Sequence, residues 1–436
     1  MANQKRDLLD DLIDIQSDWQ ALSNPFGDIA DSLAADPSQR KVFNPADYKE
    51  KPFANSNRCL CTASGRDDAC TRCLDVCPVN AIEIHKQSVI IGDDCRKCGL
   101  CAAVCPTETI STRRHMPRQV YDKIARAASA YEHCYVTCTR ALKRLPKDNE
   151  IVLGCVGAIS RDLWFSLMAD YGNISVYLPV GICDRCKTTT GEEFYCDAIG
   201  TAEEWAQASL GLVADESEMT HELTREYKRS QFMSSAVHSA ERLLTRTNPA
   251  LAGAKAVANK ISAHASRLDQ LQRTLEGAVG AKTSNNRQRM LTQNRKLVMG
   301  ALQHDEGLAK FIDLTAPVCD ASKCTMCGDC AKVCTTRALD LDVNGHITIQ
   351  ASYCVSCGAC VKVCEDGALA MEPMDVTELI VPDPAAEELA RKKAQAKAEA
   401  QKYIEQGKKQ LSRAADVLEG FGTSDSGAND SKTSKK

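Results

Sequence analysis

Short stretches of alternating hydrophobic and polar residues mark the predicted strands of the chain. Residues 81–84 and 88–91 form one pair of such stretches, and residues 339–343 and 346–349 form another. Asn344-Gly345 lies between the second pair and is the strongest short hairpin signal, because both residues accept the positive φ of a tight turn. The pattern therefore predicts two antiparallel hairpins that are far apart in the sequence.

The region after the first hairpin has continuous apolar runs instead of alternation. Residues 151–153 and 174–178 are predicted as buried strands, and residues 162–170 between them as a helix. Alternation of strand and helix is typical of an α/β unit with a parallel sheet. We therefore expect a small α/β domain over residues 116–205.

A helical pattern follows over residues 206–315, with a break at Asn248-Pro249. Apolar residues recur on one helical face at near-heptad spacing. These residues are Val257, Ile261, Leu268, Leu271 and Leu275. We expect a helical hairpin that packs against its own protein, and a coiled coil that binds a partner is the alternative.

The two ends of the chain have different patterns. Residues 1–50 contain a short amphipathic stretch from Leu8 to Ile15, followed by breaks at Asn24-Pro25 and Asn44-Pro45. Residues 376–436 are rich in Ala, Lys and Glu and end in a Ser/Gly-rich segment, which predicts a charged helix and a disordered tail. The lysines there are interleaved with glutamates, so a solvated helix is favoured over nucleic-acid binding.

Cysteine content changes this picture. The chain has 436 residues and a net charge of only −4, but it contains 24 cysteines. The charge gives no indication of a nucleic-acid or membrane-surface partner. Residues 1–10 contain no export signal, and no apolar run is long enough to span a bilayer, so we expect a cytoplasmic protein. In that reducing compartment, dense cysteines indicate metal binding rather than disulfides.

The C-terminal cysteine block, residues 316–375, contains two runs with the spacing C-x2-C-x2-C-x3-C. Three cysteines at this spacing wrap a loop around one cluster, whereas the fourth opens a helix and reaches the neighbouring cluster. Gly328 and Gly358 stand where the backbone must turn tightly. The spacing therefore predicts crossed ligation by two sets: Cys324, Cys327, Cys330 and Cys364, and Cys354, Cys357, Cys360 and Cys334.

The N-terminal block, residues 51–115, contains one regular run and one altered run. In the altered run, the insertion Thr62 to Ala69 displaces the first cysteine. Cys61 is the nearest upstream cysteine and is the predicted ligand, with Cys59 as its competitor. A [3Fe–4S] cluster is an alternative at this altered position. Crossed ligation predicts two sets: Cys61, Cys70, Cys73 and Cys105, and Cys95, Cys98, Cys101 and Cys77.

Both blocks resemble the bacterial-type ferredoxin that carries two [4Fe–4S] clusters. That family usually has a proline after the fourth cysteine. Pro78 and Pro106 keep this feature, whereas Thr335 and Glu365 replace it in the C-terminal block. The resemblance implies two dicluster ferredoxin modules with four [4Fe–4S] clusters, which transfer single electrons.

Further cysteines lie in the predicted α/β domain. Cys155 follows the first buried strand, and Cys183 and Cys186 follow the second, at the strand ends where open α/β sheets gather ligands. With Cys134 and Cys138, they form a candidate metal site. The arrangement is similar to the delta subunit of methyl-viologen-reducing hydrogenases, which implies a [2Fe–2S] cluster and a docking role. A structural zinc ion or free buried thiols, with Cys196 among them, are the alternatives.

These predictions combine into an α+β fold of six regions. They are a helical lead segment (1–50), an N-terminal dicluster ferredoxin module (51–115), a cysteine-containing α/β domain (116–205), a helical region (206–315), a C-terminal dicluster ferredoxin module (316–375), and a charged helix with a disordered tail (376–436).

The chain shows no glycine fingerprint for a nucleotide cofactor and no apparent hydrolase arrangement. We therefore expect a non-catalytic electron-transfer subunit of a larger cytoplasmic oxidoreductase, whose partners donate and accept electrons. One alternative is an enzyme that reduces disulfides or sulfur compounds at the middle cysteines. Another is an iron–sulfur scaffold or redox sensor.

Overall fold

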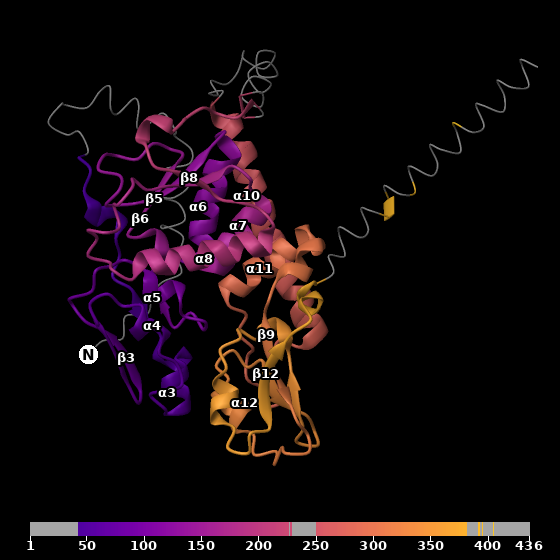
Figure 1. The fold of residues 1–436 in the computed structure, drawn as a ribbon. Coiled ribbons are helices and arrows are strands. Elements are labelled where there is room, and N and C mark those ends of the chain that lie inside the picture. The colour runs from indigo at the N-terminus through magenta and orange to yellow at the C-terminus, as the bar shows by residue number, and fades with distance from the viewer. Residues whose placement is uncertain are drawn as a thin grey trace, which may run out of the picture. The chain divides into compact units, whose positions relative to one another are not determined.

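The computed structural model describes residues 42–225, 227–228 and 250–381, together with residues 391, 392, 395 and 404 (Figure 1). Contacts divide the chain into two units, residues 1–381 and residues 382–436. The predicted lead helix near Leu8, the break at Asn248-Pro249 and the disordered tail lie outside the described residues. The mixed helix and strand content confirms the predicted fold class.

The N-terminal module is built around the predicted hairpin. Strand β2 (Ile82–His85) pairs antiparallel with β3 (Ser88–Ile91), and β1 (Phe53–Ala54) pairs antiparallel with β4 (Ile110–Ser111). Three short helices lie between these strands. They are α3 (Leu60–Ser64), α4 (Arg72–Asp75) and α5 (Leu100–Ala103).

The C-terminal module repeats this order of elements. Strand β10 (Leu339–Leu341) pairs antiparallel with β11 (Ile347–Ile349), and Gly345 in the turn has φ +84°. An outer pair again encloses the hairpin, because β9 (Thr315–Cys319) pairs antiparallel with β12 (Leu369–Pro373). The short helices of this module are α12 (Asp329–Val333) and α13 (Ala359–Val363).

One detail of the cysteine motif differs from the prediction. The fourth cysteine does not open a helix, because Cys334 and Cys364 lie at the C-terminal ends of α12 and α13. Three residues separate the third and fourth cysteines, and about one helical turn fits that interval. The helices begin instead after Gly328 and Gly358, which have φ +76° and +74°. Glycine accepts this left-handed conformation without steric cost.

The chain segment between the two modules forms a sheet of four parallel strands in the order β6-β5-β7-β8. Parallel neighbours need long crossovers, and helices supply them here. The sheet extends past residue 205, the domain end expected from the sequence. The strands are β5 (Cys134–Cys138), β6 (Glu150–Leu153), β7 (Ile174–Tyr177) and β8 (Gly211–Val213), and the helices are α6 (Pro117–Ala130), α7 (Arg161–Asp170) and α8 (Gly191–Ala206).

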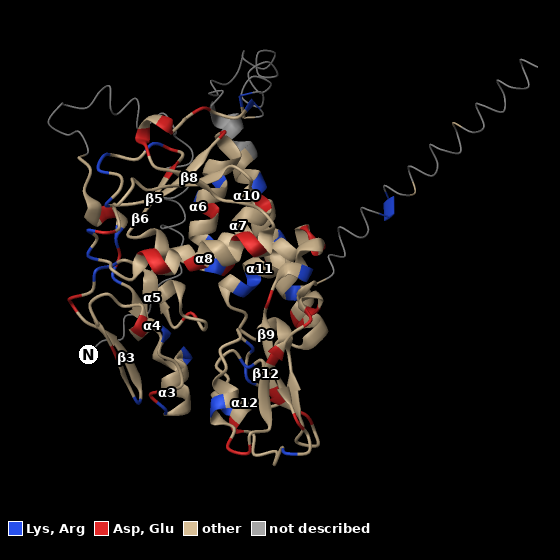
Figure 2. Ribbon diagram, in the orientation of Figure 1, with Lys and Arg blue, Asp and Glu red and all other residues tan. Residues whose placement is uncertain are grey.

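Two further helices cover this domain. Helix α10 (Ala250–Val279) packs against α6, and α11 (Gln293–His304) packs against α7. Leu268, Leu271 and Leu275 of the predicted apolar stripe are buried. The stripe therefore packs against its own protein. Figure 2 shows acidic and basic residues interspersed over these elements.

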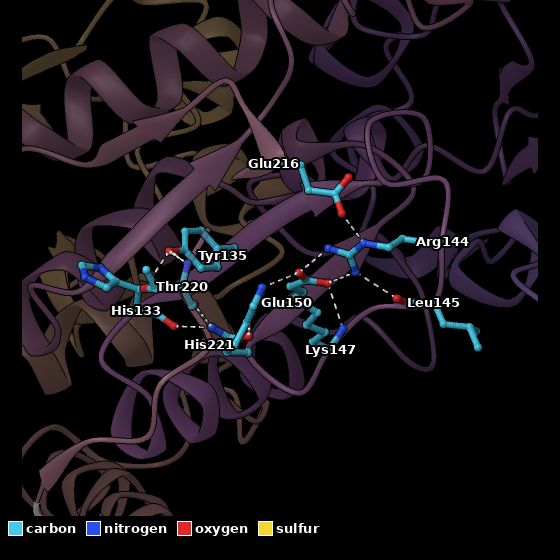
Figure 3. Close-up of polar contacts among 10 residues, drawn as sticks. His133, Tyr135, Arg144, Leu145, Lys147, Glu150, Glu216, Thr220 and His221 are labelled. Carbon is cyan, nitrogen blue, oxygen red and sulfur yellow. Dashed lines mark hydrogen bonds and ion pairs between the residues drawn. The ribbon is translucent and has the colours of Figure 1, made fainter. Parts of the chain in front are cut away.

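An ion pair with a buried carboxylate lies at the start of β6 (Figure 3). Arg144 donates two hydrogen bonds of 2.7 Å to the carboxylate of Glu150, whose side chain is fully buried. The backbone N–H of Lys147 adds a third hydrogen bond at 2.8 Å. Burial alone would raise the pKa of Glu150, but the hydrogen bonds from Arg144 and Lys147 hold it below its ordinary value. Glu150 is therefore charged at neutral pH and depends on its partners.

No described helix combines the length and the apolar composition that crossing a bilayer would require.

Candidate iron–sulfur cluster sites

One cavity of the N-terminal module is lined by four thiols from three segments of the chain. Cys59 precedes α3, Cys70 and Cys73 flank the start of α4, and Cys105 follows α5. Burial raises the pKa of Cys73 to about 12, and the neighbouring thiols of Cys105 and Cys70 add to the shift. Such thiols stay protonated until a cation binds them, so cluster binding must release their protons.

Cys61, the predicted first ligand, is not among the residues that line this cavity. Its Sγ donates a hydrogen bond to the backbone oxygen of Cys70 at 3.1 Å, and the side chain is almost fully buried. Burial raises the pKa of its thiol to about 11. The structure therefore places the competitor Cys59 at the cavity. The sequence carried no signal for this choice, because both cysteines precede the insertion.

The second site of the N-terminal module groups Cys98 and Cys101 with Cys95 and Cys77. Burial raises the pKa of Cys98, and the nearby thiols of Cys95 and Cys77 act in the same direction. Burial also raises the pKa of Cys101, and the thiols of Cys98 and Cys95 are the largest neighbouring contributions to the shift. This grouping agrees with crossed ligation, which stays a prediction.

The C-terminal module shows the same grouping. Cys334 lines one cavity together with the three cysteines of the other run, Cys354, Cys357 and Cys360. In the other predicted ligand set of this module, burial raises the pKa of Cys330 to about 11, and Cys327 and Cys324 are its neighbouring thiols. The fourth predicted member, Cys364, lies close to Cys319, which in turn contacts Cys324.

The fourth cysteine of every run has the same local geometry. Its Sγ accepts a hydrogen bond from the backbone N–H four residues later. The contacts are Ala81 N to Cys77 Sγ at 3.3 Å, Thr109 N to Cys105 Sγ at 3.2 Å, Ala338 N to Cys334 Sγ at 3.3 Å and Ala368 N to Cys364 Sγ at 3.3 Å. Such bonds stabilise a thiolate and tune the potential of a cluster that it ligates. Two of the sites are each lined by four thiols, which are the donor set that a [4Fe–4S] cluster requires, so the residues fit this group.

The middle domain brings four of its cysteines to a cavity of about 310 Å3. Cys138 ends β5, Cys155 follows β6, and Cys183 and Cys186 follow β7. These three strands are parallel neighbours, so their carboxyl ends meet at one edge of the sheet. The loops after them therefore gather the thiols.

Two middle cysteines lie elsewhere. Cys134 is at the opposite end of β5 from Cys138, and a strand rises about 3.3 Å per residue, so the two thiols are far apart. The Cys134 side chain is fully buried, 3.9 Å from the backbone oxygen of Ile124. Cys196 is exposed on α8.

Basic side chains surround the middle cavity. Lys49, Arg96, Arg140 and Lys187 contribute to its lining, together with the single acid Glu192. Their positive charge favours thiolates. The sequence gave no reason to single them out, because basic residues are common in loops. Among the described residues, no three His, Cys, Asp or Glu side chains converge closely enough to hold a single metal ion.

The middle site adjoins the N-terminal module. A Cβ on Gly154 would lie 2.5 Å from the backbone oxygen of Lys97, and one on Gly99 would lie 2.8 Å from the Cβ of Ala158. The loop that carries Cys98 therefore packs directly on the loop that carries Cys155. Burial raises the pKa of Cys155 to about 12, and Cys98 is among the thiols that add to this shift.

Comparison with known proteins identifies the two modules. The family described as the 4Fe-4S dicluster domain matches residues 66–109 and 323–368. A ferredoxin of Methanothermococcus thermolithotrophicus is 37% identical over 46 residues, which are 10% of this chain and 77% of the relative. An uncharacterized ferredoxin of Methanocaldococcus jannaschii is 40% identical over 43 residues, 9% of this chain and 69% of the relative.

No solved structure matches the chain. The family matches lie outside residues 116–205, so the likeness to the hydrogenase delta subunit stays a prediction. The first match begins at residue 66, after both candidates for the displaced ligand. With two dicluster domains and ferredoxin relatives, the chain belongs to the ferredoxin family of 4Fe–4S dicluster proteins.

Proposed function

We propose that the chain is an electron-transfer subunit of a larger cytoplasmic redox complex and carries four [4Fe–4S] clusters. The observation that carries this proposal is the duplicated module, in which each of two cysteine runs has the same N–H···S contact at its fourth cysteine. Each bound cluster accepts and releases one electron. The protein's own residues hold the clusters and bias their potentials through burial and these hydrogen bonds.

The proposed ligands follow the thiols that share each site. Cys59 replaces Cys61 in the altered run, since it lines the cavity and Cys61 does not. The four ligand sets are Cys59, Cys70, Cys73 and Cys105; Cys77, Cys95, Cys98 and Cys101; Cys334, Cys354, Cys357 and Cys360; and Cys324, Cys327, Cys330 and Cys364.

The middle domain is proposed to hold a [2Fe–2S] cluster on Cys138, Cys155, Cys183 and Cys186. The four thiols line one cavity of about 310 Å3. A structural zinc ion on the same four thiols is the alternative. The contact between Gly154 and Lys97 places this site next to the N-terminal module, where electrons would enter or leave.

A reducing compartment suits these sites. The chain has 24 cysteines, and most of them lie in the groups described above. An oxidising compartment would favour disulfides among such closely grouped thiols. The proposed partners are the redox proteins that donate electrons to the chain and accept electrons from it.

The test is the content of iron, acid-labile sulfide and zinc per chain after anaerobic purification. We expect about eighteen irons, from four cubanes and one two-iron cluster, with no zinc. About sixteen irons and one zinc would keep the four-cluster relay and reject the [2Fe–2S] cluster. About eight irons would reject the relay, because one module would then hold no clusters.

A further inference from the structure

The insertion that displaces the first cysteine motif contacts the C-terminal module. Lys362 of α13 donates hydrogen bonds to the backbone oxygens of Asp68 and Ala69 at 2.9 and 3.2 Å. In return, Arg66 donates to the backbone oxygen of Lys362 at 3.1 Å. Helix α3, whose last three residues are the first residues of the insertion, also lies against α12 (Figure 1).

Two cluster sites of different modules also lie beside one shared cavity. Cys105 of one site and the loop residues Val355 and Ser356 of the other line the same cavity of about 660 Å3, together with Arg72. The Arg72 guanidinium lies close enough to interact with Cys70 of its own module and with Cys357 of the C-terminal module. It is therefore a positive charge between the two sites.

We propose that the insertion Thr62 to Ala69 is a latch that holds the two ferredoxin modules together, with the Cys59–Cys70–Cys73–Cys105 site facing the Cys334–Cys354–Cys357–Cys360 site. This inference rests on the proposed function, in which both sites hold clusters. One electron passes from the cluster of one site to the cluster of the other. The first cluster is oxidised, the second is reduced, and no bond or proton is transferred. The residues that break the cysteine spacing thereby join two separate modules into one path.

The C-terminal module offers a matched control for the latch. Lys332 and Lys362 occupy the same position in the two cysteine runs, two residues after the third cysteine. Lys332, however, bonds Asp329 of its own run at 2.7 Å, and its side chain is 72% exposed. Charge reversal at either lysine therefore changes the net charge by the same amount. Only the change at Lys362 removes hydrogen bonds to the backbone of the other module.

The experiment compares Lys362→Glu and Lys332→Glu in the full-length, cluster-loaded chain. Spin–spin interaction between reduced clusters is measured by electron paramagnetic resonance, and trypsin cleavage after Arg66 is followed by fragment mass. For Lys362→Glu we expect the intermodule part of the spin–spin broadening to be lost and cleavage after Arg66 to become several-fold faster. Lys332→Glu should behave like the wild-type chain in both measurements.

Iron content separates failure of the latch from failure of the proposed function. A Lys362→Glu chain with full iron, unchanged broadening and unchanged cleavage would overturn the latch and leave the four-cluster proposal intact. A wild-type chain with too few irons would instead overturn the proposed function. If the Lys362→Glu chain itself loses iron, the same two measurements on Lys362→Met decide whether the latch exists. This variant keeps the aliphatic stem and removes the hydrogen-bond donors.

Discussion

Cys59 and Cys61 stand two positions apart at the start of α3, yet their thiols have different surroundings. Cys59 lines the cavity that it shares with Cys70, whereas the Cys61 thiol donates to the backbone oxygen of Cys70. Residues two positions apart on a helical turn do not face the same direction, so one helix start cannot present both thiols to one cluster. Cys59 is therefore the proposed ligand, and Cys61 ties the start of the insertion to the backbone of Cys70.

This difference predicts the outcome of two serine substitutions. Cys59→Ser should lose up to about four irons per chain, because a cubane loses one of its ligands. Cys61→Ser should keep the full iron content, because a serine hydroxyl can donate the same hydrogen bond. Iron per chain and the low-temperature spectrum of the reduced protein measure both variants. Loss of iron in Cys61→Ser alone would restore Cys61 as the ligand.

At the scale of the elements, β6 shows how a strand of the middle domain is held in place. Glu150 at its first position is buried, and its hydrogen bonds come from Arg144 in the preceding loop and from the backbone of Lys147. Arg144 also pairs with Glu216 just after β8 (Figure 3). One guanidinium therefore connects the loop before β6 with the strand at the other edge of the sheet.

Removing this guanidinium should destabilise the middle domain. Arg144→Ala leaves the Glu150 carboxylate buried without its charged partner, and we expect a loss of about 3 kcal/mol in the free energy of unfolding. Arg144→Ala combined with Glu150→Gln should recover part of the loss, because the buried group is then neutral. Denaturant unfolding followed by tryptophan fluorescence measures both. Equal stability of the single and double variants would contradict the proposed role of the pair.

At the scale of the whole molecule, the middle domain and the N-terminal module meet through close backbone contacts. Gly154 leaves no room for a Cβ beside the backbone oxygen of Lys97, whereas Gly172 has open space around it. A carbonyl oxygen on the cluster loop cannot move aside like a flexible side chain. The distance between the two loops therefore depends on glycine at position 154.

Two alanine substitutions test this contact. Gly154→Ala should lower the free energy of unfolding by about 1–3 kcal/mol, since an overpacked contact must be relieved by moving one of the loops. Gly172→Ala is the control and should change stability little. Thermal unfolding of the cluster-loaded chains gives the comparison. Equal midpoints for the two variants would mean that the loops can separate without cost.

Removal of iron should unfold the ferredoxin modules and leave the parallel sheet folded. The ferredoxin modules contain only short helices and two-stranded sheets, which are marginally stable by themselves, so metal binding supplies much of their folding free energy. The parallel sheet has its own buried core, which includes Trp164 and Leu167. After chelation, hydrogen exchange should become fast in residues 66–109 and 323–368 and stay slow in β5 and β7. Equal protection throughout would show that the modules fold without clusters.

The sequence by itself determined the ferredoxin modules, because the spacing of cysteines within one run is a local property. It also determined the hairpin at Asn344-Gly345 and two of the four strands of the parallel sheet, β6 and β7, which follow from local hydrophobic patterns. Strands β5 and β8 were not predicted. Gly328 was correctly placed at a tight turn. The regular runs therefore needed no tertiary information.

Only the tertiary structure decided which distant thiols meet. Cys138 joins Cys155 and Cys183 because the strand order makes β5 the neighbour of both β6 and β7, and Cys134 is excluded because it lies at the other end of its strand. The contact of Lys362 with the insertion likewise joins segments almost 300 residues apart. Spacing along the chain cannot encode such meetings, since they depend on the direction and order of the elements that carry each residue.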